Sequence, residues 1–185
     1  MMDKFTWVLD LVVGYSVKSG YEVRMKNANH SYISEDISKA FSLLWKIPTP
    51  ISVKAFGRRS FHNMFPTKDK LLSRGVLPTS NDFMCMLCNS HGEDRDHLFF
   101  RCAVALVVWR KIAYWLDIIV TRTSSSWQHF LLWSGNCRSK KTYRGKDGMI
   151  WLAVMWCFGV LINEILFNGT VCNVLDLIRN IKLKV

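Results

Sequence analysis

Acidic residues are scarce in this sequence. Asp and Glu number 14 against 25 Lys and Arg, so the formal net charge is +11 at pH 7 over 185 residues. A chain this basic is attracted to polyanions, so we expect nucleic acid as its partner, either RNA or DNA, with a membrane surface as the disfavoured alternative. Internal repeats and low-complexity tracts are also lacking, and 50% hydrophobic residues argue against a disordered chain. The length excludes two large catalytic domains.

Several functional motifs are missing as well. Neither G-x-x-x-x-G-K-[ST] nor G-x-G-x-x-G occurs, which excludes the common phosphate-binding loops. No nucleophile motif surrounds His30, His62 or His129. We therefore expect a protein that is not an enzyme. The first residues lack the charged, apolar and small-residue regions of a secretory signal, so we expect an intracellular protein, nuclear or cytoplasmic, that is not secreted.

One apolar run competes for a membrane interpretation. Residues 148–163 carry no charge, and Glu164 ends the run. A membrane-spanning helix needs about 20 apolar residues. We therefore expect a buried helix here, although hydropathy alone could favour a transmembrane segment.

The spacing of apolar residues predicts a mainly helical chain. We expect a short strand over residues 15–17 and helices over residues 19–25, 34–46, 51–65, 67–75, 97–119, 148–167 and 171–183. Pro48 and Pro50 should stop the second helix, and Gly75 should provide a left-handed end for the fourth. A Ser- and Thr-rich stretch followed by a basic loop indicates a linker. This pattern divides the chain into a domain over residues 1–119, a linker over 120–147 and a helical hairpin over 148–185.

A cysteine-rich segment carries the clearest chemical signal. Cys85 and Cys88 are followed by His97 and Cys102 in the pattern C-x2-C-x8-H-x4-C. Two cysteines three apart can direct both sulfurs to one point, and the His and Cys supply two more tetrahedral corners. Four such ligands leave no position for water, so we predict a structural Zn2+ held in a knuckle-like hairpin that packs on the following long helix. His91 is an alternative fourth ligand, and buried thiols without metal are the alternative to the site as a whole.

The remaining residues near this segment have secondary roles. We expect Arg95 and Arg101 to offset the charge of the thiolates and to donate hydrogen bonds to sulfur. Cys137 falls in the basic loop, whereas Cys157 and Cys172 occupy apolar helical positions. We expect these last two to behave as small hydrophobic residues and not as ligands.

Basic and aromatic residues alternate ahead of the cysteines. This mixture can hold phosphates and stack on bases. The alternative is a solvated basic face above a core lined by Phe56, Phe61 and Phe65. The predicted nucleic-acid-binding residues are Lys54, Arg58, Arg59, Lys68, Lys70 and Arg74.

Four groups of residues together carry a family resemblance. They are Tyr15 to Tyr21, Leu44 to Pro48, Phe65 to Val76, and the set Cys85-x-x-Cys88, Glu93, His97-Leu98-Phe99-Phe100-x-Cys102 and Val108-Trp109. In this order they resemble the zinc-binding domain that follows the polymerase in reverse transcriptases of plant LINE-type (non-LTR) retrotransposons. The resemblance implies a non-catalytic zinc finger module of a retrotransposon polyprotein. It also implies two partners, namely RNA or target DNA and the reverse transcriptase domains of the parent polyprotein.

The chain departs from the family pattern at two places and also lacks a polymerase motif. Residues Gly159 to Asn163 stand where the family commonly has an aromatic residue and an Arg-Asn pair. Phe56-Gly57-Arg58-Arg59 stands where the family usually has Phe-x-Trp-Arg, which implies the loss of a core tryptophan. The aromatic-x-Asp-Asp signature of the polymerase is absent, so we expect no nucleotidyl transfer. An alternative function is therefore a zinc-stabilised protein-interaction module, or a decayed remnant, that does not bind nucleic acid.

Overall fold

The computed structural model describes residues 16–19, 34–77, 83–119, 123, 125–135 and 146–185. Within these ranges helices dominate and no strand forms, so the expected mainly α class is confirmed. The chain divides into two units, Met1–Glu35 and Asp36–Val185. In the first unit residues 17–19 form a helical turn, so the predicted strand is wrong at residue 17. The rest of the first predicted helix lies outside the described residues.

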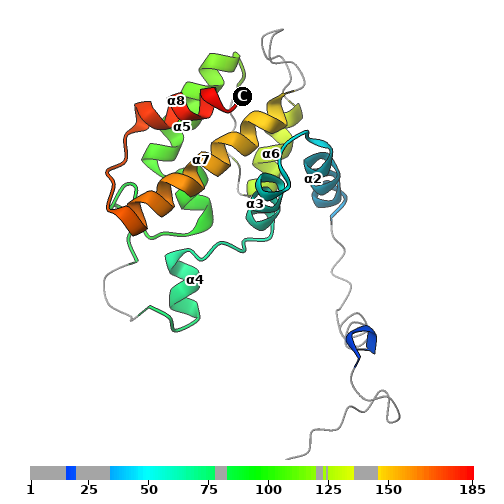
Figure 1. The fold of residues 1–185 in the computed structure, drawn as a ribbon, viewed down its shortest axis with the longest axis horizontal. Helices are drawn as coiled ribbons and strands as arrows, with labels where there is room; N and C mark the ends of the chain where they lie inside the picture. Colours follow the sequence, from blue (N-terminus) through cyan, green and yellow to red (C-terminus); the bar gives the residue numbers. More distant parts are fainter. Residues whose placement is uncertain (1–15, 20–33, 78–82, 120–122, 124, 136–145) are drawn as a thin grey trace, which may run out of the picture. The chain divides into compact units, whose positions relative to one another are not determined.

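The helices can be followed along the chain in Figure 1. In order they are α2 (Glu35–Lys46), α3 (Ile51–Phe61), α4 (Lys68–Ser73), a π-helical turn η1 (His97–Arg101), α5 (Ala103–Leu116), α6 (Ser126–Gly135), α7 (Asp147–Asn168) and α8 (Val174–Leu183). Helix α7 contacts α3, α6 and α8, while α5 contacts η1 and α8. The second unit is therefore built around α7, with α8 connecting it to the helix that follows the cysteine-rich segment.

Helix α7 is the apolar run noted in the sequence. By length and composition it could cross a membrane, but half of its most apolar window is buried inside the protein. The buried half includes Ile150, Trp151, Val154 and Phe158, which are fully enclosed. A core helix accounts for this burial, and the absence of a membrane partner stays a prediction.

Local signals set several helix ends as expected. Helix α2 ends at Lys46, before Pro48, and Gly75 has a φ of +67° just beyond α4.

Two helices differ from the prediction. The single helix predicted over residues 97–119 is wrong, because the backbone at Cys102 is extended (φ −58°, ψ 140°) and separates η1 from α5. Helix α8 begins three residues later than predicted, where the Asn173 side chain accepts hydrogen bonds from two backbone N–H groups of its first turn.

Helix α6 lies within the segment predicted as a linker. Its side chains His129, Phe130 and Trp133 are buried, and the Trp133 indole N–H donates to the carbonyl of Asp147 at 3.0 Å. Ten helical residues between a Ser- and Thr-rich stretch and a basic loop gave too weak a periodic signal to be recognised. Residues 136–145 of that loop, including Cys137, lie outside the described residues, and the predicted domain boundaries stay a prediction.

Candidate metal centre

Cys85 and Cys88 lie in a tight turn. The turn is closed by an isolated antiparallel bridge between Met84 and Gly92. Inside it the backbone N–H of Asn89 donates to the carbonyl of Cys85 at 2.7 Å. Asn89 has a φ of +48°, a left-handed conformation that asparagine tolerates better than most residues. The expected knuckle-like hairpin is therefore present.

The start of η1 and the break after it supply the other two side chains of the predicted set. His97 begins η1, and Cys102 is the extended residue after it. Cys85 Sγ lies 4.0 Å from Cys102 Sγ, and Cys88 Sγ lies 3.3 Å from His97 Nε2. All four potential ligand atoms are within 4.8 Å of one another. With this extended backbone, the sulfur of Cys102 lies beside that of Cys85 in the knuckle.

This arrangement fits a single tetrahedral ion. Zinc–sulfur bonds of about 2.3 Å and zinc–nitrogen bonds of about 2.0 Å place tetrahedral sulfurs about 3.8 Å apart and sulfur and nitrogen about 3.5 Å apart. The Cys85–Cys102 and Cys88–His97 separations deviate from these values by a few tenths of an ångström. The other candidate, His91, is exposed and its ring centroid lies 5.3 Å from that of His97. It is not a member of the four-residue cluster.

Backbone hydrogen bonds favour the thiolate forms of the two buried cysteines and burial favours neutral His97, although the pKa of Cys85 is raised overall. Cys85 and Cys102 are fully buried. Two backbone N–H groups of the knuckle donate to the first sulfur and two from the start of α5 donate to the second, which stabilises thiolates. The hydrogen bond between the two thiols, with burial, raises the pKa of Cys85, whereas the same bond lowers the pKa of Cys102. Burial, followed by the nearby His91, lowers the pKa of His97, and neutral imidazole is the ligating form.

Glu93 connects the knuckle to helix α4. Its side chain is buried, and its carboxylate accepts hydrogen bonds from the backbone N–H groups of Lys68 at 3.3 Å and Met86 at 3.4 Å. Burial raises the pKa of Glu93, and these two donors counter part of that shift. The Lys68 ammonium donates to the carbonyl of Met84 at 3.1 Å. The sequence gives no signal for this connection, because Lys68 lies 25 residues before Glu93.

The expectation that two arginines donate to sulfur is wrong. The buried Arg95 donates to the carboxylate of Asp96 at 2.7 Å and to the carbonyl of Ser60 at 3.0 Å. Arg101 donates to both carboxylate oxygens of Asp94, at 2.8 and 2.9 Å. Arg95 instead attaches the cysteine-rich segment to the end of α3, 35 residues earlier in the chain.

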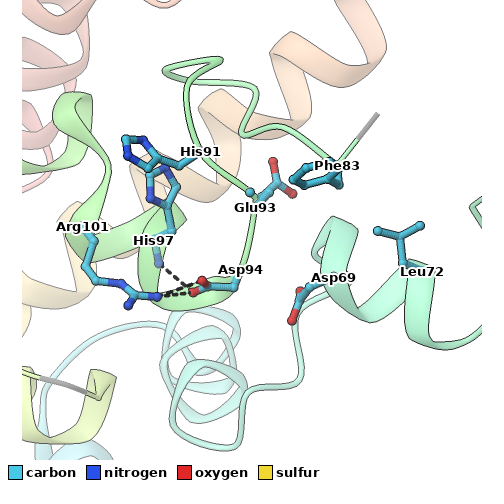
Figure 2. Close-up of a pocket in the computed structure, with 9 residues that line it drawn as sticks. Asp69, Leu72, Phe83, His91, Glu93, Asp94, His97 and Arg101 are labelled. Atoms are coloured by element: carbon cyan, nitrogen blue, oxygen red, sulfur yellow. Dashed lines mark hydrogen bonds and ion pairs between the residues drawn. The ribbon is translucent and has the colours of Figure 1, made fainter. Parts of the chain in front are cut away.

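A cavity of about 540 Å³ lies beside His97. Figure 2 shows the Arg101–Asp94 pair on one side of it and Phe83 and Leu72 on the other. Burial would raise the pKa of Asp94, but the backbone N–H of His97 and the Arg101 guanidinium lower it overall. The carboxylates of Asp69 and Glu93 also line the cavity. A site with more carboxylates than guanidinium groups does not suit a phosphate.

The six predicted nucleic-acid-binding residues differ in their availability. Arg58, Arg59 and Arg74 are exposed. Lys70 is half-buried. The ammonium groups of the other two donate to main-chain carbonyls, Lys54 to Trp45 at 3.0 Å and Lys68 to Met84 at 3.1 Å. Two of the six basic side chains therefore form hydrogen bonds within the protein, which makes them less available to a ligand.

The aromatic residues among these cations belong mainly to the core. Phe61 and Phe65 are each 7% exposed, which leaves too little surface for stacking on a base. Phe61 and Phe65 therefore line the core, whereas a basic face that is merely solvated stays a prediction. Arg58, which stands where the family usually has tryptophan, is exposed, and the implied loss of a core tryptophan stays a prediction. Among the other cysteines, Cys157 is buried in α7, and Cys172 lies in the connection before α8 and not in a helix.

Comparison with known proteins identifies the family. Residues 15–109, more than half of the chain, match the family described as zinc-binding in reverse transcriptase. No curated protein and no solved structure matches the chain. The matched residues contain the knuckle, η1 and all four members of the cluster. The chain therefore belongs to the family of zinc-binding domains of reverse transcriptases.

Proposed function

We propose that this chain is a non-catalytic zinc-binding module, derived from the reverse transcriptase polyprotein of a plant LINE-type retrotransposon, that helps the polymerase hold nucleic acid. The observation that carries the proposal is the convergence of Cys85, Cys88, His97 and Cys102 within 4.8 Å in a member of this family. The same proposal places the protein inside the cell, in the nucleus or cytoplasm, in contact with the reverse transcriptase domains of its parent polyprotein and away from membranes.

The zinc ion would have a structural role. Three sulfurs and one imidazole complete a tetrahedral shell, and such a closed site has no position for a water molecule to be activated. The four ligands come from the knuckle, from the start of η1 and from the residue before α5, so one ion would crosslink these three segments. Structural zinc contributes about 10–16 kcal/mol to the folding of finger peptides. Removal of the ion should therefore unfold this region.

Metal content tests the zinc site directly. We expect the reduced, purified chain to contain one equivalent of zinc and Cys88→Ser to contain none. Cys172→Ser is the matched control, because Cys172 is also half-buried but lies outside the cluster. Equal zinc content in the three proteins would contradict the assignment.

Nucleic-acid binding rests on the net charge of +11 and on the exposed arginines of α3 and of the segment after α4. Neutralisation of six phosphates on duplex DNA gives a slope of about −5 in log K against log salt. If only the four basic residues whose side chains are not bonded to carbonyls take part, the slope is about −3.6. Binding at low salt that weakens with one of these slopes supports the proposal, and binding independent of salt contradicts it.

A second candidate is a zinc-stabilised protein-interaction module, or a decayed remnant, that does not contact nucleic acid. Exposed apolar side chains around the end of α7 favour it, among them Leu166 at 55%, Phe167 at 81% and Val171 at 89% exposure. Charge reversal at Arg58 and Arg59 separates the two candidates. Reversal abolishes binding to an oligonucleotide if these arginines contact phosphates. Equal binding before and after reversal removes them from the proposed interface, and failure of the unaltered chain to bind the oligonucleotide favours the protein-interaction module.

A further inference from the structure

A groove of about 350 Å³ lies between α3 and α7, two helices that contact one another along the second unit (Figure 1). Residues three and four apart lie on the same face of a helix, and both walls follow that spacing. Helix α3 contributes Ser52, Phe56 and Arg59, and α7 contributes Trp156, Gly159 and Asn163. The groove contains no cysteine and none of the four candidate metal ligands.

The floor of the groove is aromatic. Phe56 and Trp156 are both half-buried, and their ring centroids lie 5.6 Å apart at an interplanar angle of 74°. Gly159 makes this arrangement possible, since a Cβ atom there would approach the ring of Phe56 to 2.5 Å. In contrast to Phe61 and Phe65, these two rings retain surface that a flat, apolar ligand can contact.

The rim of the groove is polar and basic. Arg59 and Asn163 are exposed on opposite walls, and the Arg59 guanidinium lies 5.7 Å from the ring centroid of Phe65. An asparagine amide offers both a donor and an acceptor to the edge of a base. A guanidinium can bind a phosphate or stack on a base. Arg58, the residue before Arg59 in α3, is also exposed but does not line the groove.

The absence of lining carboxylates distinguishes this groove from two other cavities in the described part of the chain. The cavity beside His97 contains Asp69, Glu93 and Asp94, and a third cavity, between α7 and α8, contains Glu164 and Asp176. The α3–α7 groove has only neutral and positive side chains. Its charge therefore complements a polyanion, and its aromatic floor complements a base.

We propose that the α3–α7 groove holds one unpaired base of a single-stranded nucleic acid. In this site the base contacts Phe56 and Trp156, the amide of Asn163 bonds to the base edge, and Arg59 holds the adjoining backbone. A base inside a duplex has both faces stacked and its pairing edge occupied, so it cannot enter the α3–α7 groove. The inference rests on the proposed nucleic-acid binding and specifies that the preferred ligand is single-stranded.

Two probes of equal length and charge test this site: a ten-nucleotide strand of thymidine and a ten-unit abasic strand. The full chain, purified with zinc under reducing conditions, is titrated into each labelled probe at low salt. We expect the thymidine strand to bind about fivefold tighter or more, the effect of one stacked base. Asn163→Ala and Trp156→Leu should remove this preference while leaving the abasic strand bound as before.

Matched control variants distinguish binding in the groove from non-specific attraction by positive surface charge. Asn180→Ala removes an exposed asparagine of α8, and Arg110→Ala removes an exposed arginine of α5. We expect both controls to keep the preference for thymidine. Arg59→Ala should reduce binding of the thymidine strand more than Arg110→Ala does, although each loses one positive charge.

The two strands distinguish binding of a base in the groove from general binding of the phosphate backbone. Equal binding of the two strands by the unaltered chain overturns the base site and leaves salt-dependent phosphate binding intact. Retention of the preference in folded Asn163→Ala and Trp156→Leu also overturns it, because the base must then bind elsewhere. If neither strand binds, both the base site and the proposed nucleic-acid binding are wrong. Photocrosslinking of a 5-iodouridine strand to α3 or α7 would support the site independently.

Discussion

Protonation of His129 should destabilise the fold at mildly acidic pH. The side chain is 6% exposed, and its ring centroid lies 4.5 Å from that of Trp109 and 4.8 Å from that of Phe100. Its Nδ1 atom accepts a hydrogen bond of 2.9 Å from the indole N–H of Trp151. Because an indole N–H can only donate, Nδ1 must be unprotonated and the neutral ring carries its proton on Nε2. A second proton would face the Trp151 donor.

The structure gives both the sign and the size of this effect. Burial lowers the pKa of His129 from 6.5 to about 4. Between these values the unfolded chain binds a proton that the folded chain does not, so stability is lost as the pH falls from 6.5 to 4. The complete loss is about 3 kcal/mol, at 1.36 kcal/mol per pKa unit. At pH 5 it should already be about 2 kcal/mol.

Urea denaturation of the unaltered chain and of His129→Asn, each at pH 7 and pH 5, measures this effect. The asparagine carbonyl can accept the Trp151 hydrogen bond but does not titrate. Carboxylates and the cysteine-rich cluster titrate in both proteins, so their contributions cancel in the comparison. We expect the unaltered chain to lose about 2 kcal/mol more than His129→Asn between the two pH values. Equal losses in the two proteins would refute a neutral, buried His129.

Three further perturbations test the fold around the candidate sites. Chelation of zinc should lower the melting temperature of the unaltered chain by tens of degrees, because the ion supplies energy comparable to the whole stability of a domain, about 5–15 kcal/mol; an unchanged melting curve would show that the ion is dispensable. Gly159→Ala should lower the free energy of unfolding by about 1–3 kcal/mol, because the new methyl group displaces the Phe56 ring. Gly135→Ala places its methyl group in open space, so it should change the free energy of unfolding by no more than about 0.5 kcal/mol. Glu93→Ala should lower the free energy of unfolding by about 1–3 kcal/mol, because it leaves two backbone N–H donors unpaired. A loss of stability no larger than that of Glu164→Ala, at an exposed position, would contradict the role of Glu93 as a connection to α4.

Features that depend on neighbouring residues could be predicted from the sequence. The end of α2 before Pro48 and the left-handed Gly75 follow from the backbone preferences of proline and glycine. The convergence of Cys85 and Cys88 also has a local cause, because two residues three apart in a tight turn face the same side. Spacing and the family resemblance predict Cys102 as a ligand. The geometry that brings its sulfur to the others, an extended residue between two helices, has no signal in the sequence.

Contacts between distant residues decided the rest. Helix α6 forms in a segment with weak periodicity, because His129, Phe130 and Trp133 meet aromatic partners from other helices. The availability of the basic residues likewise depends on main-chain carbonyls elsewhere in the fold, which engage Lys54 and Lys68 but leave the arginines exposed. Residue spacing specifies which side chains share a face of one helix. Burial and hydrogen-bond partners arise between elements, so the support given by Glu93 and Arg95 and the groove between α3 and α7 appear only once the helices have packed.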